Sequence, residues 1–298
     1  MHAVWACLLG FLCAAFGQEK TIPLPEGTRL AIPAQAGASA KWVLPVNLKM
    51  KAGANPVFGV DTNGLPWFSY AGKVLANPLK GFAAEVDPPY SDLAWLDTGD
   101  LVLCANGSIG VLQTNAAQPP QADGGLPVFR FAPVLALPPG TFRLFPGCGG
   151  SLYLVGRQAT SNEVYVLERH GTSGSVRKLL VTDKPVDAVA GDGVRTYLAS
   201  GRSVVQVDFL RGRLSNVFTH AAEGIRQMAY SPSAGLFYAT DTHVGTLSPK
   251  GRPLEFMATA RPQIVLHGNA LFVMLGNSCA VLRIDRVDAL ARLALREE

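Results

Sequence analysis

Short segments in which apolar and polar residues alternate recur along the chain, separated by glycine-containing turns. Alternation at 163–169, 203–209, 243–248 and 280–285 is typical of half-buried β-strands. Strands rich in Leu, Tyr and Phe follow a glycine in six places. These leading glycines stand 35, 51, 43, 42 and 33 positions apart: Gly64, Gly99, Gly150, Gly193, Gly235 and Gly268. The spacing predicts six repeats of one small unit.

Each unit also carries an apolar stretch before its glycine, which we interpret as the innermost strand. The six stretches are 56–61, 92–97, 141–145, 186–191, 225–231 and 262–268, and candidate outermost strands are 175–181, 213–220 and 253–258. Units of three to four antiparallel strands predict an all-β fold. We therefore expect a six-bladed β-propeller with blades of about four strands.

The two ends of the chain and one insertion fall outside the repeat. The sixth unit lacks a fourth strand after Asp285, whereas strand-like stretches at 28–33 and 41–48 have no blade of their own. We expect one of them to close the ring, because closure removes an exposed sheet edge. The expected organisation is an N-terminal segment with the closing strand (18–54), the propeller (55–287) and a C-terminal tail (288–298). Residues 113–127 read as an inserted loop in the second blade, and helical spacing from Val287 onward predicts a short helix.

The fifth unit carries a family resemblance. Its strand 236–241 reads Leu-Phe-Tyr-Ala-Thr-Asp, and the unit 225–251 resembles an NHL-type propeller blade. Over 55–287 the pattern is also similar to gluconolactonase-like and cell-surface YVTN-type propellers, which the sequence does not separate. The other units depart from the NHL pattern at the position of Asp241, where they carry Tyr70, Ala105, Gly156, Ala199 and Met274. The resemblance implies a six-bladed propeller.

Composition argues against a disordered chain, and the charge distribution argues against a nucleic-acid partner. With 48% hydrophobic and 16% charged residues, the chain is too apolar to be disordered. Its 26 basic and 22 acidic residues give a net charge of +4 without any run of like charge. A nucleic-acid partner is therefore not expected.

The first residues predict export. Residues 1–17 form an apolar run with the length of a signal-peptide core, and small residues precede Gln18 at Ala15 and Gly17. The run lacks Lys and Arg before its apolar core, and a buried first strand is the alternative. We expect cleavage near Gly17, a secreted or periplasmic protein, and no transmembrane segment in the mature chain.

Cysteines and one sequon allow two interpretations each. The mature chain keeps three cysteines, so at most one disulfide can form, and free thiols usually pack as small hydrophobic groups: Cys104, Cys148 and Cys279. None has a basic neighbour in sequence that would activate it. Asn106-Gly107-Ser108 is an N-glycosylation acceptor sequence or a tight turn, and we favour the turn.

Polar residues at recurrent positions suggest a binding face. Innermost-strand starts and the second turns of the blades emerge on one side of a propeller. We therefore expect five residues of the fourth and fifth units to surround one opening: Asp187, Arg202, Arg226, Asp241 and His243. The alternative for Asp241 is capping of its own turn. The histidines are otherwise interpreted as solvated or turn residues.

Two functions follow. The first is a binding module, expected to be monomeric and to need no cofactor, that holds a protein or cell-envelope component on this face. It accords with the lack of any nucleophile, Walker or zinc-protease motif. The alternative is a metal-dependent lactonase or esterase-like hydrolase, which needs several oxygen ligands for an ion such as Ca²⁺. Candidate ligands are Asp61, Asp92, Asp187 and Asp241, of which only Asp92 and Asp187 stand at the starts of innermost strands.

Overall fold

The computed structural model describes residues 23–33, 36–45, 56–70, 72–98, 100–112, 126–131, 133–157, 160–170, 173–208, 213–248, 252–276 and 278–296. The expected signal peptide at 1–17 lies outside these residues, as does most of the expected insertion at 113–127. Within the described ranges the chain is almost entirely strand, and no helix combines the length and hydrophobicity needed to span a bilayer.

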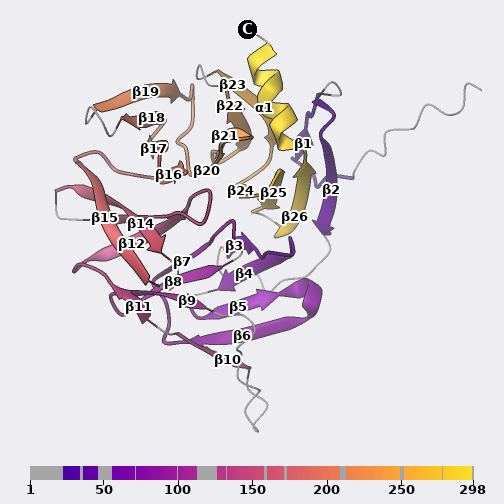
Figure 1. Cartoon of the computed structure of the whole chain (residues 1–298). Coiled ribbons are helices and arrows are strands. Elements are labelled where there is room, and N and C mark those ends of the chain that lie inside the picture. Colours follow the sequence, from indigo (N-terminus) through magenta and orange to yellow (C-terminus); the bar gives the residue numbers. More distant parts are fainter. Residues whose placement is uncertain are drawn as a thin grey trace, which may run out of the picture.

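Six small sheets arranged around a centre confirm the predicted six-bladed β-propeller (Figure 1). Blade 1 contains β3 (Val57–Val60), β4 (Pro66–Tyr70), β5 (Val74–Asn77) and β6 (Phe82–Asp87), and blade 2 contains β7 (Asp92–Trp95), β8 (Leu101–Ala105), β9 (Ser108–Leu112) and β11 (Pro133–Ala136). Blade 3 contains β12 (Thr141–Pro146), β13 (Leu152–Arg157), β14 (Asn162–His170) and β15 (Ser173–Thr182). Blade 4 contains β16 (Ala188–Gly191), β17 (Thr196–Ser200), β18 (Ser203–Asp208) and β19 (Arg213–Thr219). Blade 5 contains β20 (Gln227–Ser231), β21 (Gly235–Ala239), β22 (His243–Leu247) and β23 (Pro253–Ala258).

Blade 6 is completed by the N-terminal segment, as expected. Its strands are β24 (Gln263–His267), β25 (Ala270–Leu275), β26 (Ala280–Asp285) and β2 (Ser39–Leu44), with β2 antiparallel to β26. Leu44 is fully buried, and the Lys41 ammonium lies 3.2 Å from the Asp285 carboxylate. The strand from the start of the chain therefore covers the edge that the last blade would otherwise expose.

Three smaller elements lie at the margin of the ring. Strand β1 (Arg29–Leu30) adds to β23 of blade 5, and β10 (Val128–Arg130) pairs in parallel with β6 of blade 1. The 3₁₀ turn η2 (Pro78–Lys80) joins β5 to β6. The predicted C-terminal helix is α1 (Val287–Arg296), which packs against β21 and β22. The fifth strands β1 and β10 are additions that the repeat pattern does not contain.

Neighbouring innermost strands are joined by side chains as well as by packing. Asp92 accepts a hydrogen bond from the Leu144 N–H of blade 3 at 2.7 Å. Gln227 accepts one from Ile264 N–H of blade 6 at 2.8 Å. We call Asp92, Gln227 and Gln263 the inter-blade acceptors, because Gln263 completes the set across the ring closure.

Gln263 joins the last blade to the first. Its side-chain oxygen accepts from the Phe58 N–H at 3.1 Å, and its amide nitrogen donates to the Pro56 carbonyl at 2.7 Å. Between blades 1 and 2 the contact is steric instead. A Cβ on Gly59 would lie 1.6 Å from the Trp95 ring, so only glycine allows this approach.

The sequon follows the interpretation that we favoured, and the cysteines follow theirs in part, because Cys104 is buried whereas Cys148 and Cys279 are half-buried. Asn106 and Gly107 have φ values of 49° and 69° in the turn between β8 and β9, which confirms a tight turn. The three cysteines are free. Burial raises the pKa of each thiol: Cys104, Cys148 and Cys279.

Removal of the closing strand should destabilise the ring. We expect a variant lacking residues 1–48 to aggregate, because β26 would present an unpaired edge and the pocket of Leu44 would be empty. Light scattering and thermal unfolding measure the effect. A control lacking only residues 1–22 keeps β1 and β2 and should remain unaffected. A monomeric 1–48 deletion with unchanged Tm would contradict the closure.

Candidate functional site

One end of the blades carries all five residues of the predicted binding face. Because successive strands within a blade are antiparallel, connections that enter the innermost strands lie at the same end as turns between second and third strands. Asp187 and Arg226 occupy such connections. Arg202 and Asp241 belong to such turns, and His243 begins the third strand β22 directly after one. We call this end of the blades the entry face. The topology therefore places the five residues on one side of the ring.

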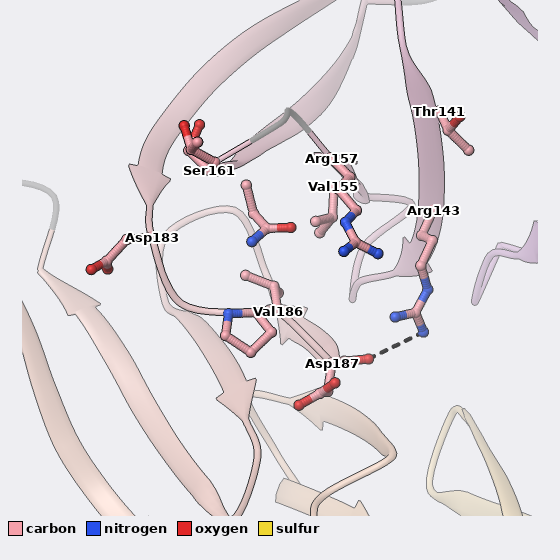
Figure 2. A pocket seen from close by; sticks show the side chains of 11 residues that line it. Thr141, Arg143, Val155, Arg157, Ser161, Asp183, Val186 and Asp187 are labelled. Carbon is pink, nitrogen blue, oxygen red and sulfur yellow. Dashed lines mark hydrogen bonds between the residues drawn. The ribbon is translucent and has the colours of Figure 1, made fainter.

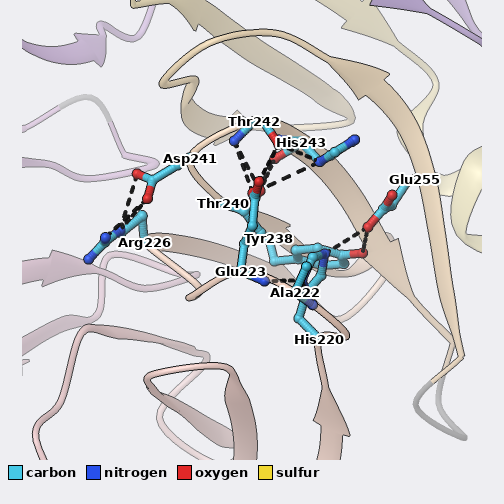
Figure 3. A network of polar contacts seen from close by, with 10 residues as sticks. All are labelled: His220, Ala222, Glu223, Arg226, Tyr238, Thr240, Asp241, Thr242, His243 and Glu255. Atoms are coloured by element: carbon cyan, nitrogen blue, oxygen red, sulfur yellow. Dashed lines mark hydrogen bonds and ion pairs between the residues drawn. The ribbon is translucent and has the colours of Figure 1, made fainter.

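Arg226 and Asp241 form an exposed ion pair within blade 5 (Figure 3). Their closest charged atoms, Arg226 Nη2 and Asp241 Oδ2, are 3.0 Å apart, and the Arg226 Nε–H also donates to the carboxylate. The side chains are 57% and 51% exposed. The bond to Asp241 raises the pKa of the Arg226 guanidinium, and the negative charge of Asp187 adds to the effect. Such a pair contributes little to stability and keeps both charges within reach of a partner.

Asp187 and Arg202 are linked through the turn between β17 and β18. The Asp187 carboxylate accepts from the Gly201 N–H at 2.7 Å, immediately before Arg202 in the chain. The Arg202 guanidinium donates to the Ala221 carbonyl at 2.9 Å, in the connection that leads to Arg226. Backbone contacts thus hold both side chains in place on the entry face.

His243 belongs to a second polar group that includes Glu223 (Figure 3). The Thr242 hydroxyl lies 2.6 Å from Glu223 Oε1 and 2.7 Å from His243 Nδ1. Burial acts to raise the pKa of Glu223, but hydrogen bonds from Thr240 and Thr242 lower it below its ordinary value. The hydroxyl therefore donates to an ionised carboxylate and accepts from His243, whose proton resides on Nδ1.

The turn that carries Asp241 is capped by its neighbour. The Thr240 hydroxyl accepts from the N–H groups of His243 at 2.9 Å and Thr242 at 3.2 Å, and Thr240 is buried. The alternative that Asp241 caps its own turn is wrong, since its carboxylate binds Arg226. The Thr240 side chain points into the turn and accepts hydrogen bonds from its N–H groups, whereas Asp241 remains exposed.

His220 is buried rather than solvated, and its ring binds a turn, which agrees with the second of the two interpretations offered for the histidines. Its Nδ1 accepts from the backbone N–H groups of Ala222 and Glu223, so Nε2 carries the proton and donates to Glu255 Oε1 at 2.9 Å (Figure 3). Tyr238 donates to the same oxygen at 3.3 Å. Burial, followed by the charge of Glu255, raises the pKa of the Tyr238 hydroxyl. Because Glu255 is distant in sequence, no local pattern revealed this network.

A polar pocket of about 870 Å³ lies at the same end of the blades, between blades 3 and 4 (Figure 2). Its lining is Thr141, Arg143, Val155, Arg157, Thr160, Ser161, Asn162, Asp183, Pro185, Val186 and Asp187. Of these, sequence analysis identified only Asp187. Exposed Thr141 and Arg143 alternate with buried Phe142 and Leu144 along β12, which was a readable signal for side chains turned away from the core.

The four candidate carboxylate ligands do not converge. Asp61 lies at the other end of its blade, in the turn between β3 and β4, where it accepts from Asn63 N–H, Leu65 N–H and the Trp67 indole. Asp92 is held by Leu144, and burial raises the pKa of its carboxyl. Within the described ranges, no three His, Cys, Asp or Glu side chains come together as a metal ion requires.

Comparisons with known proteins identify the fold. No protein-family model matches the chain, and a search of curated proteins finds no similar sequence. Among solved structures, a gluconolactonase from Xanthomonas campestris has a TM-score of 0.58 at 12% identity, over 87% of this chain and 94% of the other. A protein assigned as a gluconolactonase has a TM-score of 0.55 at 14% identity, over 87% and 97% of the two chains. A luciferin-regenerating enzyme gives 0.53 at 14%, over 84% and 95%. The chain therefore has the propeller fold of gluconolactonase-like proteins.

Thr240 and Asp241 should differ sharply in their contribution to stability. Thr240→Val deprives the His243 N–H of its hydroxyl acceptor and leaves the Thr242 N–H with the Glu223 carboxylate alone, and it should lower the free energy of unfolding by about 1–3 kcal/mol. Asp241→Ala removes an exposed ion pair and should cost no more than about 1 kcal/mol. Urea denaturation of the two variants measures both values. Equal losses, or a greater loss for Asp241→Ala, would show that Asp241 supports the turn.

Proposed function

We propose that this chain is an exported β-propeller binding module that holds a protein or another cell-envelope component on its entry face. Export is inferred from the signal-like residues 1–17. A mixture of acidic and basic side chains fits a polar or protein partner better than a nucleic acid, which would need a basic surface. The module is expected to act as a monomer.

The observation that carries the proposal is the exposed Arg226–Asp241 pair beside Asp187. The side chains of Arg226 and Asp241 are both about half exposed, so the ion pair contributes little to the stability of the fold. Asp187, meanwhile, lines the large polar pocket on the same face. Charged groups that add little to stability, on the same face of the ring as a polar pocket, support a role in recognition.

Loss of either charge should weaken the partner complex without unfolding the protein. We expect Arg226→Ala and Asp241→Ala each to reduce recovery of a specific component from the envelope fraction of the producing cell by about tenfold. Immobilised wild type and variants are compared by quantitative mass spectrometry, and Tm is recorded for each.

Arg213→Ala is the matched control, because Arg213 is an exposed arginine at the opposite end of blade 4. It should recover the component at the wild-type level. The proposal fails if every recovered component binds the Arg226, Asp241 and Arg213 variants equally well.

A metal-dependent lactonase or esterase-like hydrolase is the second candidate, favoured by the likeness of the fold to gluconolactonases. At 12% identity this likeness extends to the fold alone. The described carboxylates do not form the oxygen cluster that Ca²⁺ would need, so no mechanism is derived through a metal.

Addition of metal distinguishes the two functions. A binding module should show no change in Tm with millimolar Ca²⁺ or Zn²⁺ and no hydrolysis of a panel of lactones and aryl esters. A Ca²⁺-dependent rise in Tm together with lactone hydrolysis that chelation abolishes would instead establish the hydrolase.

A further inference from the structure

The pocket between blades 3 and 4 contains two guanidinium groups without a carboxylate between them. Arg143 and Arg157 extend from neighbouring strands β12 and β13 into the same part of the pocket (Figure 2). Arg143 donates to the main-chain carbonyl of Asp187 at 3.2 Å, and its guanidinium lies over the Phe145 ring, 4.8 Å from the ring centroid. Among the described residues its remaining N–H groups have no other hydrogen-bond acceptor. Arg157 is exposed and has no hydrogen-bond or ion-pair partner in the part of the chain that the structure describes.

Neither arginine forms an ion pair with a carboxylate within the described ranges, although Asp92 lies close enough to Arg143 for the guanidinium charge to act to lower the pKa of the Asp92 carboxyl. Asp187 directs its carboxylate to the Gly201 N–H, toward the next turn of blade 4. Asp183 lies at the far side of the pocket from Arg143 (Figure 2). The side of the pocket that contains Arg143 and Arg157 is therefore positive. The opposite side carries the exposed Asp183 carboxylate, which can accept hydrogen bonds. Two planar guanidinium groups match the oxygens of a carboxylate or phosphate group, which they bind by charge-assisted hydrogen bonds.

The remaining lining is suited to hydroxyl groups. Thr141, Thr160 and Ser161 supply hydroxyls that both donate and accept. The Asn162 amide nitrogen donates to the Lys184 carbonyl at 2.9 Å. This bond fixes the Asn162 side chain and leaves the Asn162 amide oxygen as an acceptor. A volume of about 870 Å³ lies within the range of small-molecule sites.

We propose that this pocket binds a small hydroxylated oxyanion, with its carboxylate or phosphate group on Arg143 and Arg157 and its hydroxyl groups toward Asp183. This site goes beyond the partner-binding function, because neither arginine belongs to the Arg226–Asp241 pair. A fully dianionic ligand with a charge at each end is disfavoured, since its second anion would face Asp183.

Calorimetric titration with four probes tests the site: glycerate, glycerol 3-phosphate, inorganic phosphate and neutral glycerol. We expect saturable binding of glycerate or glycerol 3-phosphate at millimolar or lower Kd, in constant ionic strength, and no binding of glycerol. The better of the two hydroxylated probes identifies the anionic group. Arg157→Ala should weaken binding at least tenfold and Arg157→Lys less, because lysine keeps the charge but loses the planar pair of donors.

Two further variants make the result specific. Asp183→Ala should weaken glycerate and glycerol 3-phosphate severalfold while leaving inorganic phosphate unchanged. Arg226→Ala should leave all four titrations unchanged, so failure of the partner-binding function and failure of this pocket are separable. Absence of saturable binding by any anion, or binding that Arg157→Ala leaves intact in a protein of wild-type Tm, would overturn the proposal.

Discussion

Hydrogen bonds from backbone N–H groups of one innermost strand to a side chain of the preceding innermost strand join blade 6 to blade 1, blade 2 to blade 3 and blade 5 to blade 6. Phe58, Leu144 and Ile264 are buried, and each donates its N–H to an inter-blade acceptor, namely Gln263, Asp92 or Gln227. A buried N–H without an acceptor costs about 1–3 kcal/mol, more than the net gain of an ordinary hydrogen bond. Loss of any of the three acceptors would therefore destabilise the fold, and their bonds constrain the angle between the blades that they join.

These bonds also position the side chains of the entry face. Gln227 directly follows Arg226, and Leu144 directly follows Arg143. The bond to the Leu144 N–H fixes the backbone next to Arg143, and the Arg226 N–H is itself held by the Ala239 carbonyl at 2.8 Å. The exposed charges can therefore keep a defined arrangement although their own ion pairs are weak. The close approach of Gly59 to Trp95 likewise constrains how the innermost strands of blades 1 and 2 lie against each other.

Local repetition made the ring predictable. Glycine spacing and alternation identified strands such as β21 and β22, because these features depend on neighbours in sequence. Closure by the N-terminal segment followed from the missing fourth strand of the sixth unit, but the sequence did not decide between 28–33 and 41–48. The parallel pairing of β10 with β6 was not predictable, since it follows a long insertion and joins two blades. The polar networks and the pocket also depend on tertiary contacts, which the sequence pattern does not show. Glu255 binds His220 although 35 residues separate them, and Arg157 lies near Arg143 only because β13 pairs with β12.

Amide hydrogen exchange tests the coupling of the blades most directly. If the inter-blade acceptors hold the innermost strands together, the N–H groups of Phe58, Leu144 and Ile264 should exchange as slowly as those of the central strands β8 and β25, near the limit of global unfolding. Exchange at the rate of an exposed amide without an acceptor would contradict the account, because the N–H groups of Phe58, Leu144 and Ile264 would then open to water without unfolding of the ring.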